Sequence, residues 1–441
     1  MSDVEETRMG NNAIVWFTNN LRVKDNNALQ DAIEKNSKVL GVYFFDPRHF
    51  KKTKYGFKKT EKFRAKFLIE TLKDLQRNLR LLNIPLLVIH GKPEEHFNDI
   101  ILTYNIRHIY HLNEWTQEEA SVLEHCKSNT PKKVKWNTYY DQFLFHPEDI
   151  PFEIKEMPKV FTTFRKKIEK HTSIRTERYS VGFLTDNFLK VDTRIPTLQD
   201  LGYEAFEVDS RTAFPFSGGE TDALQRLYHY IWKTQQIRTY KETRNGLIGL
   251  EYSSKFSAWL ANGSLSPKTI YHHVEAYEKN HGSNSSTYWL KFELLWRDFF
   301  KYISLKHGND IFKLEGILGK HYSWEDDQKK IEQWIKGQTN EPFVNANMNE
   351  IANTGWMSNR GRQNVASYFS KHLHLDWRIG AAYFESMLID YDVHSNYGNW
   401  LYVAGVGNDP RDRVFNIQLQ AKNYDPDNEF QNLWLENVIS L

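Results

Sequence analysis

The run IVWFTNN at residues 14–20 is the first of five short apolar stretches that decide the fold of the first third of the chain. The others are VLGVYFF (39–45), PLLVIHG (85–91), HIYHL (108–112) and KVKWNTYY (133–140). Short apolar runs that alternate with longer helix-compatible stretches are typical of a parallel sheet whose strands are connected by crossover helices. The first third is therefore predicted to be an α/β domain built on a five-stranded parallel sheet.

The stretch between the second and third runs supports this interpretation. In FRAKFLIETLKDLQRNLRLLN (63–83), apolar residues recur at helical spacing with charged residues on the opposite face, which predicts an amphipathic helix. No Gly-x-Gly-x-x-Gly or Walker-type loop follows any of the five runs. The sheet is thus expected to be Rossmann-like in layout, without the standard dinucleotide or triphosphate site.

The remaining chain divides into two parts. Residues 142–216 lose periodicity and carry several prolines, which predicts a long ordered linker with short helices. Helical patterns then dominate, so the predicted division is an α/β domain over 1–141, the linker over 142–216 and an all-α domain over 217–441. The expected helices in the last part lie at 223–245, 253–280, 287–308, 361–374 and 377–393.

Composition limits the classes of function. The chain has 58 Lys and Arg against 56 Asp and Glu, so nucleic-acid binding would need a local basic patch rather than bulk charge. The single cysteine, Cys126, excludes an intramolecular disulfide and a multi-cysteine metal site, and favours a reducing compartment. Because the N-terminus is polar and no apolar run reaches about 18 residues, a cytoplasmic protein without membrane association is expected.

Two segments of the second half carry polar residues in notable positions. In SSKFSAWLANGSLSP (253–267), serines and Lys255 precede an apolar helical run, where hydroxyls and free backbone N–H groups can hold a phosphate. Helix capping by serine is the alternative. In TYWLKFELLWRDFF (287–300), Glu293 and Trp296 share a helix face. An Arg or Lys partner would explain the carboxylate, and a polar ligand contact beside a base-stacking indole is the other possibility.

Arginines crowd the first turn of the helix predicted from GWMSNRGRQNVASYF (355–369), where cations oppose the helix dipole. An anion is therefore expected near Arg360 and Arg362. Asp390 and Asp392 follow at the end of a later amphipathic helix, ahead of glycine-rich chain that is expected to be irregular. An Asp-x-Asp pair can bind a metal, but these carboxylates match the two arginines better, so no metal is predicted.

Several strings in this chain resemble the flavin-binding core of the photolyase/cryptochrome family, and their wording is most similar to the DASH cryptochrome branch. The resemblance spans the chain and rests on IVWFTNNLRVKDNNAL, ANGSLSP, ELLWRDFF, GWMSNRGRQNVAS, DWRIGAAYFESMLIDYDVHSNYGNW and VAGVGNDPR. It implies an N-terminal α/β domain, a wrapped connector, and a helical domain that holds FAD in a U shape.

The resemblance assigns a group of residues to FAD. Contacts to its phosphates are expected from Tyr240, Ser253, Ser254, Lys255, Phe256 and Ser257. The groups around the isoalloxazine would be Arg297, Arg362 paired with Asp390, Asp392, and Asn396 near N5. An amide at N5 can follow changes in the flavin's protonation on reduction, which is one way a protein tunes its cofactor.

The resemblance also implies a substrate pocket for a flipped cyclobutane pyrimidine dimer. Glu293 would hydrogen-bond the base edge, Trp296 would stack on it, and Asn359 would complete the pocket, so with Asn396 these form the expected catalytic set. Further DNA contacts are expected from Arg244, Arg360, Arg413 and Gln420.

Electron transfer and light harvesting complete what the resemblance implies. Trp400, Trp377 and Trp324 match the family's chain from the surface to oxidised flavin, although core packing would explain each indole taken alone. Glu114 aligns with the carboxylate that holds a 5,10-methenyltetrahydrofolate antenna, with a solvated surface glutamate as the alternative.

Two positions depart from ordinary photolyases. A tryptophan wall of the dimer pocket is Tyr402 here, and a methionine that touches the lesion is Gln363. Both changes are typical of the DASH branch and make the pocket more polar. Weaker stacking offsets less of the few kcal/mol needed to flip a dimer out of a duplex, so single-stranded DNA is the expected substrate.

The expected activity is blue-light-driven repair of pyrimidine dimers in single-stranded DNA by a monomer. The absence of a long tail after Leu441 favours an enzyme over a signalling cryptochrome. A blue-light sensor or DNA-binding regulator without significant repair remains the alternative, because its pocket residues would be the same.

Overall fold

The parallel sheet is present in the first third of the chain. The structure is a computed structural model and describes residues 11–179, 182–409 and 411–435. All pairings in the sheet are parallel, in the order β3-β2-β1-β4-β5, so the predicted five-stranded parallel sheet is confirmed. Its strands are β1 (Asn12–Trp16), β2 (Lys38–Phe45), β3 (Leu86–His90), β4 (Ile106–Leu112) and β5 (Lys135–Tyr139).

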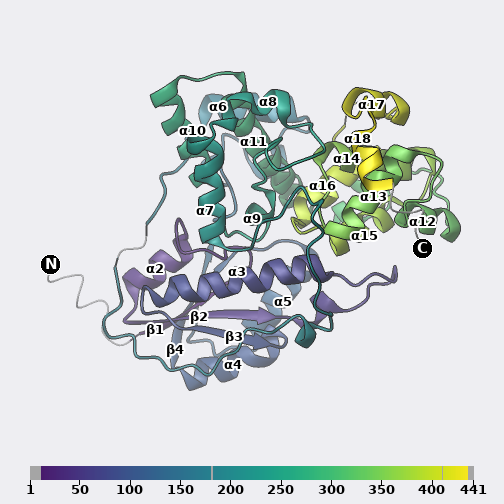
Figure 1. The fold of residues 1–441 in the computed structure, drawn as a ribbon. Helices are drawn as coiled ribbons and strands as arrows, with labels where there is room; N and C mark the ends of the chain where they lie inside the picture. Colours follow the sequence, from purple (N-terminus) through teal and green to yellow (C-terminus); the bar gives the residue numbers. More distant parts are fainter. Residues whose placement is uncertain (1–10, 180–181, 410, 436–441) are drawn as a thin grey trace.

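Helices cover both faces of the sheet because the buried strands are apolar on both sides. Ala13 and Val15 of β1 pack toward α2 (Asn27–Lys35) and α3 (Lys62–Arg80). Their neighbours Ile14 and Trp16 pack toward α4 (Pro93–Thr103) and Cys126 of α5 (Gln117–Ser128). The result is a three-layer domain, which lies at the bottom of Figure 1.

The connection after β5 has little regular structure, as the loss of periodicity predicts. It contains the 3-10 turns η2 (Ile154–Glu156) and η3 (Gln199–Leu201) and the helix α6 (Phe161–His171). Phe161 stacks on Trp296 with ring centroids 3.7 Å apart. The connection therefore packs directly against α11 of the helical region.

The second half is helical (Figure 1) and contains two apolar cores, one around α11 and one around α13 to α16. The described helices are α7 (Glu220–Tyr228), α8 (Tyr240–Thr243), α9 (Ser257–Ala261), α10 (Pro267–His281), α11 (Ser285–His307), α12 (Gln328–Ile335), α13 (Pro342–Thr354), α14 (Asn359–Ser367), α15 (Trp377–Met387), α16 (Val393–Ala404), α17 (Ile417–Tyr424) and α18 (Glu429–Leu435). Within the described ranges, no helix is both long and apolar enough to cross a lipid bilayer.

Three expectations about the helices are wrong. The helix predicted at 253–280 is two helices, α9 and α10, because residues 262–266 are not helical and α10 begins at Pro267. The helix predicted at 223–245 is broken by the π-helical turn η4 (His229–Lys233) and the 3-10 turn η5 (Gln236–Thr239), where Gln235 takes a left-handed φ of 54°. The chain after Asp392 is irregular only from Gly405 on, because residues 393–404 form α16. Asp392 caps that helix by accepting the Ser395 N–H at 2.8 Å, and Trp400 and Leu401 bury one side of it.

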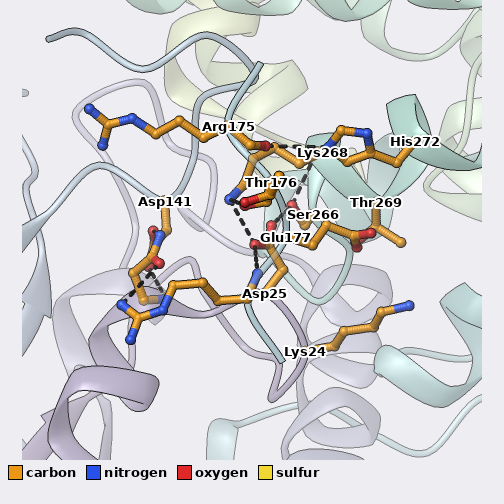
Figure 2. Close-up of polar contacts among 12 residues, drawn as sticks. Lys24, Asp25, Asp141, Arg175, Thr176, Glu177, Ser266, Lys268, Thr269 and His272 are labelled. Carbon is orange, nitrogen blue, oxygen red and sulfur yellow. Dashed lines mark hydrogen bonds and ion pairs between the residues drawn. The ribbon is translucent and has the colours of Figure 1, made fainter. Parts of the chain in front are cut away.

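The α/β domain, the connection and the helical region meet at a buried ion pair (Figure 2). Lys268 Nζ of α10 lies 2.7 Å from the Asp25 carboxylate, whose side chain is fully buried. The same ammonium donates to the carbonyl of Thr176 at 3.3 Å, and the hydroxyl of Ser266 donates to Asp25. The backbone N–H of Arg178 also reaches Asp25, at 3.1 Å. One buried carboxylate therefore joins three parts of the chain.

Candidate functional site

A cavity opens between α14, α15 and α16, with an empty volume of about 550 Å³. It brings together seven of the residues singled out from the sequence: Asn359, Arg362, Gln363, Asp390, Asp392, Asn396 and Trp400. These positions span 42 residues of sequence numbering, on α14, on α16 and in the segment between α15 and α16, so the fold gathers them around one space. The remaining lining is Ala366, Phe384, Leu388, Tyr391, Ser395, Asn399 and Val403.

The predicted Arg362–Asp390 ion pair is present in this cavity. Arg362 Nη2 donates to both carboxylate oxygens of Asp390 at 2.9 Å, and its Nε donates to the Met357 carbonyl at 2.9 Å. Ser358 caps α14 by accepting the Gly361 N–H at 3.0 Å, which places Arg362 in the first turn. The arginine that opposes the helix dipole is therefore compensated by a carboxylate from another segment.

Asp392 has a partner that the sequence interpretation missed. Lys301 Nζ of α11 lies 3.0 Å from Asp392, and the lysine side chain is only 3% exposed. Burial alone would raise the pKa of Asp392, but Lys301, followed by His394 and Arg297, holds that pKa well below its usual value. A signal for Lys301 was available, because it follows Arg297 by one helical turn on the same predicted helix.

The expected pairing of Arg360 with an aspartate is wrong. Its guanidinium donates to Gln363 Oε1 at 3.0 Å and to Asn245 Oδ1 at 3.1 Å, and it covers the ring of Tyr424 at 4.4 Å. Arg360 turns toward α17 because positions two residues apart on a helix point about 200° apart, and Arg362 already occupies the aspartate side. Its positive charge has no carboxylate partner among the ion pairs of the described residues.

Asn396 is fixed by one hydrogen bond. Its Nδ2 donates to the Ala381 carbonyl of α15 at 3.0 Å, and the residue is 8% exposed at the cavity wall. No described residue donates to its Oδ1. The amide oxygen can therefore accept a hydrogen bond from a ligand N–H.

The segment predicted to hold phosphates precedes α9 and lies outside the lining of this cavity. Lys255 is 2% exposed, has a left-handed φ of 64°, and its Nζ has no hydrogen-bond partner. Burial holds the lysine pKa well below its ordinary value. Across the described chain, no acceptor contacts the backbone N–H groups or hydroxyls of Ser253, Ser254 and Ser257. Such unused donors fit a phosphate.

Arg297, Tyr240 and Phe256 are the other residues predicted to contact FAD. Arg297 donates to the carbonyls of Gln142 at 2.6 Å and Leu260 at 3.2 Å, so it joins the connection after β5 to the end of α9. Burial lowers its pKa, while Asp392 and Asp298 oppose that shift. Tyr240 begins α8 and is 7% exposed, and burial raises its phenol pKa. Phe256 is 3% exposed and packs in the core around α11.

Glu350 is a buried carboxylate that the sequence interpretation missed. It is 1% exposed on α13, and its Oε2 has no hydrogen-bond partner. Burial raises its pKa to about 8, against the attraction of Lys255 and Arg362. Glu350 therefore interacts electrostatically with a residue of the serine segment, Lys255, and with Arg362 of the Arg362–Asp390 pair. A Glu in the middle of an apolar helical face is the sequence signal that would have marked it.

Glu293 and Trp296, which were predicted to contact the substrate, both lie on α11. Arg244 donates to Glu293 at 2.7 Å, so the cationic partner that was one explanation for this carboxylate is present. Burial nevertheless raises the pKa of Glu293, with Arg244 opposing it. The Trp296 ring lies 6.0 Å from Tyr402 at right angles. The aromatic contact therefore joins α11 to α16, on which Tyr402 lies next to Val403 of the cavity lining.

Arg413 and Gln420 lie outside the cavity lining. Arg413 Nε is 3.6 Å from Asp409, and its side chain is 40% exposed. Gln420 lies on α17 and its buried Oε1 has no partner. The structure thus does not bring these two residues to the Arg362–Asp390 pair.

The three tryptophans differ in burial. Trp400 lines the cavity and packs on Gly380, where an added β carbon would approach the indole to 2.3 Å. Trp377 is fully buried, and its Nε1 donates to the Leu314 carbonyl at 3.0 Å. Trp324 is partly exposed beside Tyr322. Of the three, only Trp324 is partly exposed, whereas Trp400 and Trp377 are buried.

Glu114 lies between the two domains. Its carboxylate accepts weak bonds from Thr18 at 3.5 Å and Asn19 at 3.4 Å. Burial, reinforced by Glu119, raises its pKa to about 8, while Lys301 opposes the shift. The next residue, Trp115, stacks on His394 of α16 with centroids 4.5 Å apart. A freely solvated surface glutamate is not what the structure shows.

Comparisons with known proteins identify the family. Residues 13–180 match the family model described as DNA photolyase, and residues 289–441 match the FAD binding domain of DNA photolyase. A Cryptochrome DASH of Gloeobacter violaceus is 46% identical over 97% of this chain and 86% of its own length. A Cryptochrome DASH of Synechocystis is 45% identical over 97% of this chain and 88% of its own.

Solved structures give the same result. The crystal structure of a Synechocystis cryptochrome superposes with a TM-score of 0.93 at 44% identity, covering 98% of this chain and 90% of that chain. The cofactor is FAD, since the domain that carries the Arg362–Asp390 pair matches an FAD-binding model. This chain is a member of the photolyase/cryptochrome family, in the group named Cryptochrome DASH.

Proposed function

We propose that this protein uses blue light to repair cyclobutane pyrimidine dimers, preferentially in single-stranded DNA, by electron transfer from excited reduced FAD. The observation that carries the proposal is the cavity in which the Arg362–Asp390 pair and Asn396 lie together with Asn359 and Gln363. The proposal assigns residues 1–141 to an antenna domain, 142–216 to a linker and 217–441 to the catalytic domain.

The residues around the cavity fit a flavin. Asn396 offers a free amide oxygen, the Arg362 guanidinium offers donors, and Asp392 offers a carboxylate kept ionised by Lys301. The serine segment offers unused N–H and O–H donors for a diphosphate. When bound, FAD supplies the photoexcited electron donor, and the protein's groups fix its position and electronics. Trp400, Trp377 and Trp324 would return the oxidised cofactor to its reduced state.

The substrate side is built from α11, α14 and α16. Glu293 would accept a hydrogen bond from the base edge, and Arg244 holds that carboxylate in place at 2.7 Å. Trp296 and Tyr402 would contact the flipped dimer, and Gln363 would meet it with an amide. Arg360 is free of any carboxylate partner in the described part of the chain, so it suits a DNA phosphate.

Preference for single strands follows from the polarity of this pocket. Tyr402 stacks less strongly than an indole, and Gln363 replaces an apolar contact with a polar one. Stacking on an aromatic side chain is worth about 1–3 kcal/mol per base, so its loss matters where a duplex must first be opened. Glu114 would hold 5,10-methenyltetrahydrofolate as an antenna at the domain boundary.

The decisive experiment is a repair assay on ultraviolet-irradiated oligonucleotides, single-stranded and duplex, in blue light and in the dark. Light-dependent loss of dimers, faster on single strands, is expected from protein with reduced FAD. No loss under illumination would overturn the repair proposal and leave a blue-light sensor or DNA-binding regulator. Equal rates on both substrates would overturn the strand preference alone.

Glu293→Ala tests the assignment of the substrate pocket. The variant should repair less while it keeps FAD, because Glu293 contacts Arg244 rather than any residue of the cavity lining. The repair yield per absorbed photon and the flavin absorbance of the purified variant are the two readouts. Loss of FAD would show that Glu293 belongs to the cofactor site instead.

A further inference from the structure

Arg226, at the end of α7, binds three backbone carbonyls of a single loop. Its Nε donates to the Ser254 carbonyl at 3.1 Å, and its Nη2 donates to those of Leu250 at 3.3 Å and Ser253 at 3.1 Å. Its Nη1 donates to the Glu251 carboxylate at 2.9 Å. We name residues 250–257 the phosphate loop, since they contain the serine segment described above.

The guanidinium of Arg226 is buried without full compensation of its charge. Its side chain is 3% exposed, whereas Glu251, its carboxylate partner, is 38% exposed and also lies 3.3 Å from His229. The rings of Phe216 and Tyr230 cover the guanidinium at 5.1 Å each. Burying a cation is costly, and most of its donors go to neutral carbonyls. The main effect of these hydrogen bonds is therefore to fix the shape of the phosphate loop, and neutralising the charge of Arg226 is secondary.

The phosphate loop separates its acceptors from its donors. Arg226 occupies three of its carbonyl oxygens, while the N–H and hydroxyl donors of Ser253, Ser254 and Ser257 have no acceptor in the described ranges. Lys255 holds a left-handed φ of 64°, a conformation that is strained for a non-glycine residue. Strain of this kind persists only where the surroundings determine the backbone, and Arg226 supplies that constraint.

We propose that Arg226 is a positioning residue for the FAD diphosphate. It binds the carbonyl oxygens of the phosphate loop, which would repel a phosphate, and thereby leaves the loop's donors to the anion. The fork of five N–H donors in arginine makes this possible, because a lysine ammonium could not reach three carbonyls and a carboxylate at once. The inference rests on the proposed placement of the FAD diphosphate at Ser253–Ser257.

The test compares flavins with and without the diphosphate. Dissociation constants of FAD and riboflavin are measured by fluorescence for the full-length wild type, Arg226→Met and Arg226→Lys. For Arg226→Met, FAD affinity should fall about 10- to 100-fold, as expected when buried acceptors lose their donors, while riboflavin affinity stays unchanged. Arg226→Lys keeps the positive charge but not the fork, so it should also lose FAD affinity.

Each outcome has a defined meaning. If Arg226→Lys binds FAD like the wild type, charge alone matters and the positioning role is wrong. If both variants weaken FAD and riboflavin equally, Arg226 supports the fold and not the diphosphate. If the wild type itself binds both flavins equally, the placement of the diphosphate at this loop is wrong, whatever the repair assay shows.

Two control variants keep the test interpretable. Glu251→Gln removes the ion pair but leaves the three carbonyl bonds, so the ratio of FAD to riboflavin affinity should hold. A change as large as that of Arg226→Met would contradict the role of the carbonyls. Arg238→Met removes an exposed arginine of η5 and should change neither constant. Thermal unfolding of each variant shows which variants are folded. If Arg226→Met does not fold, the FAD and riboflavin affinities of Arg226→Lys decide the test.

Discussion

The two ends of the proposed FAD site satisfy their polar groups differently. At the ring end, buried charges are already paired within the protein, as Arg362 with Asp390 and Lys301 with Asp392. At the phosphate loop, the N–H and hydroxyl donors of Ser253, Ser254 and Ser257 have no acceptor in the described structure. The charges of the ring end therefore have protein partners, whereas the loop keeps donors that could bind an anion.

This difference separates two properties that are often confounded in flavoproteins. Groups at the ring end hold the protein together, so their loss should lower the free energy of unfolding. The hydroxyls of Ser253, Ser254 and Ser257 in the phosphate loop have no acceptor in the described ranges, so their removal should weaken FAD binding and leave the flavin-free protein as stable as before. Changes at each end can therefore be compared directly.

The largest effect is expected from Asp390→Ala at the ring end. It leaves the Arg362 guanidinium without its carboxylate, and breaking a buried pair in this way costs about 3 kcal/mol or more. Because Arg362 is 24% exposed, the lower figure is expected. Urea unfolding measures the change.

The control for this variant is Asp310→Ala. Asp310 lies 2.7 Å from Lys313, but the two side chains are 47% and 64% exposed. An exposed pair contributes about 0–1 kcal/mol, so the control should be close to the wild type. Equal losses in the two variants would remove the distinction between a buried ring end and an ordinary surface ion pair.

The second effect concerns Glu114, which extends the charges of the ring end across the domain boundary. Burial raises its pKa to about 8, with Glu119 and Asp392 adding to the shift and Lys301 opposing it. Below that pH the carboxyl is neutral, and a pterin that donates N–H bonds needs it ionised. Folate binding should therefore release a proton, and affinity should rise up to about tenfold per pH unit until pH 8, then level off.

Titration of the folate between pH 6 and 9, followed by absorbance, measures this dependence. Glu114→Gln is the matched variant, since it keeps the shape of the side chain and cannot ionise. Its folate affinity should be low and independent of pH over this range. A wild type whose affinity falls as pH rises would contradict the role of an ionised Glu114.

The smallest effect is expected from Ser254→Ala in the phosphate loop. One hydroxyl bonded to an anion is worth about 1 kcal/mol, so the FAD dissociation constant should rise about fivefold. Urea unfolding of the flavin-free variant should match that of the wild type. Ser283→Ala, at an exposed position ahead of α11, is the control and should change neither quantity. A loss of stability in Ser254→Ala would contradict the distinction between the two ends, because it would show that the phosphate loop also stabilises the flavin-free protein.

The sequence predicted the sheet well because its buried strands are almost continuously apolar. It failed at α16, where Asn396, Gly398 and Asn399 dilute the apolar pattern that marks a helix. That helix depends on the Asp392 cap and on burial of Trp400 against Gly380 of α15. Neither contribution can be predicted from the local sequence, because the cap depends on the backbone geometry at Asp392 and the burial of Trp400 depends on a neighbouring helix.

The candidate site shows the same limit. The Arg362–Asp390 pair could be predicted because an arginine in the first turn of a helix needs an anion, and carboxylates follow later in the chain. Arg360 was mispaired, since only the helix phase decides which arginine faces the aspartates. Arg226 could not be found at all, because its partners are backbone carbonyls, which carry no signature in the side-chain pattern.

The ion pair of Asp25 and Lys268 has a consequence for cooperativity. Its groups come from the α/β domain, the connection and α10, so no single part can bury them with their charges satisfied. Unfolding any one part would leave a charged group of another part in an apolar setting. The halves should therefore melt in one transition, and a helical fragment alone should be less stable than its two apolar cores suggest.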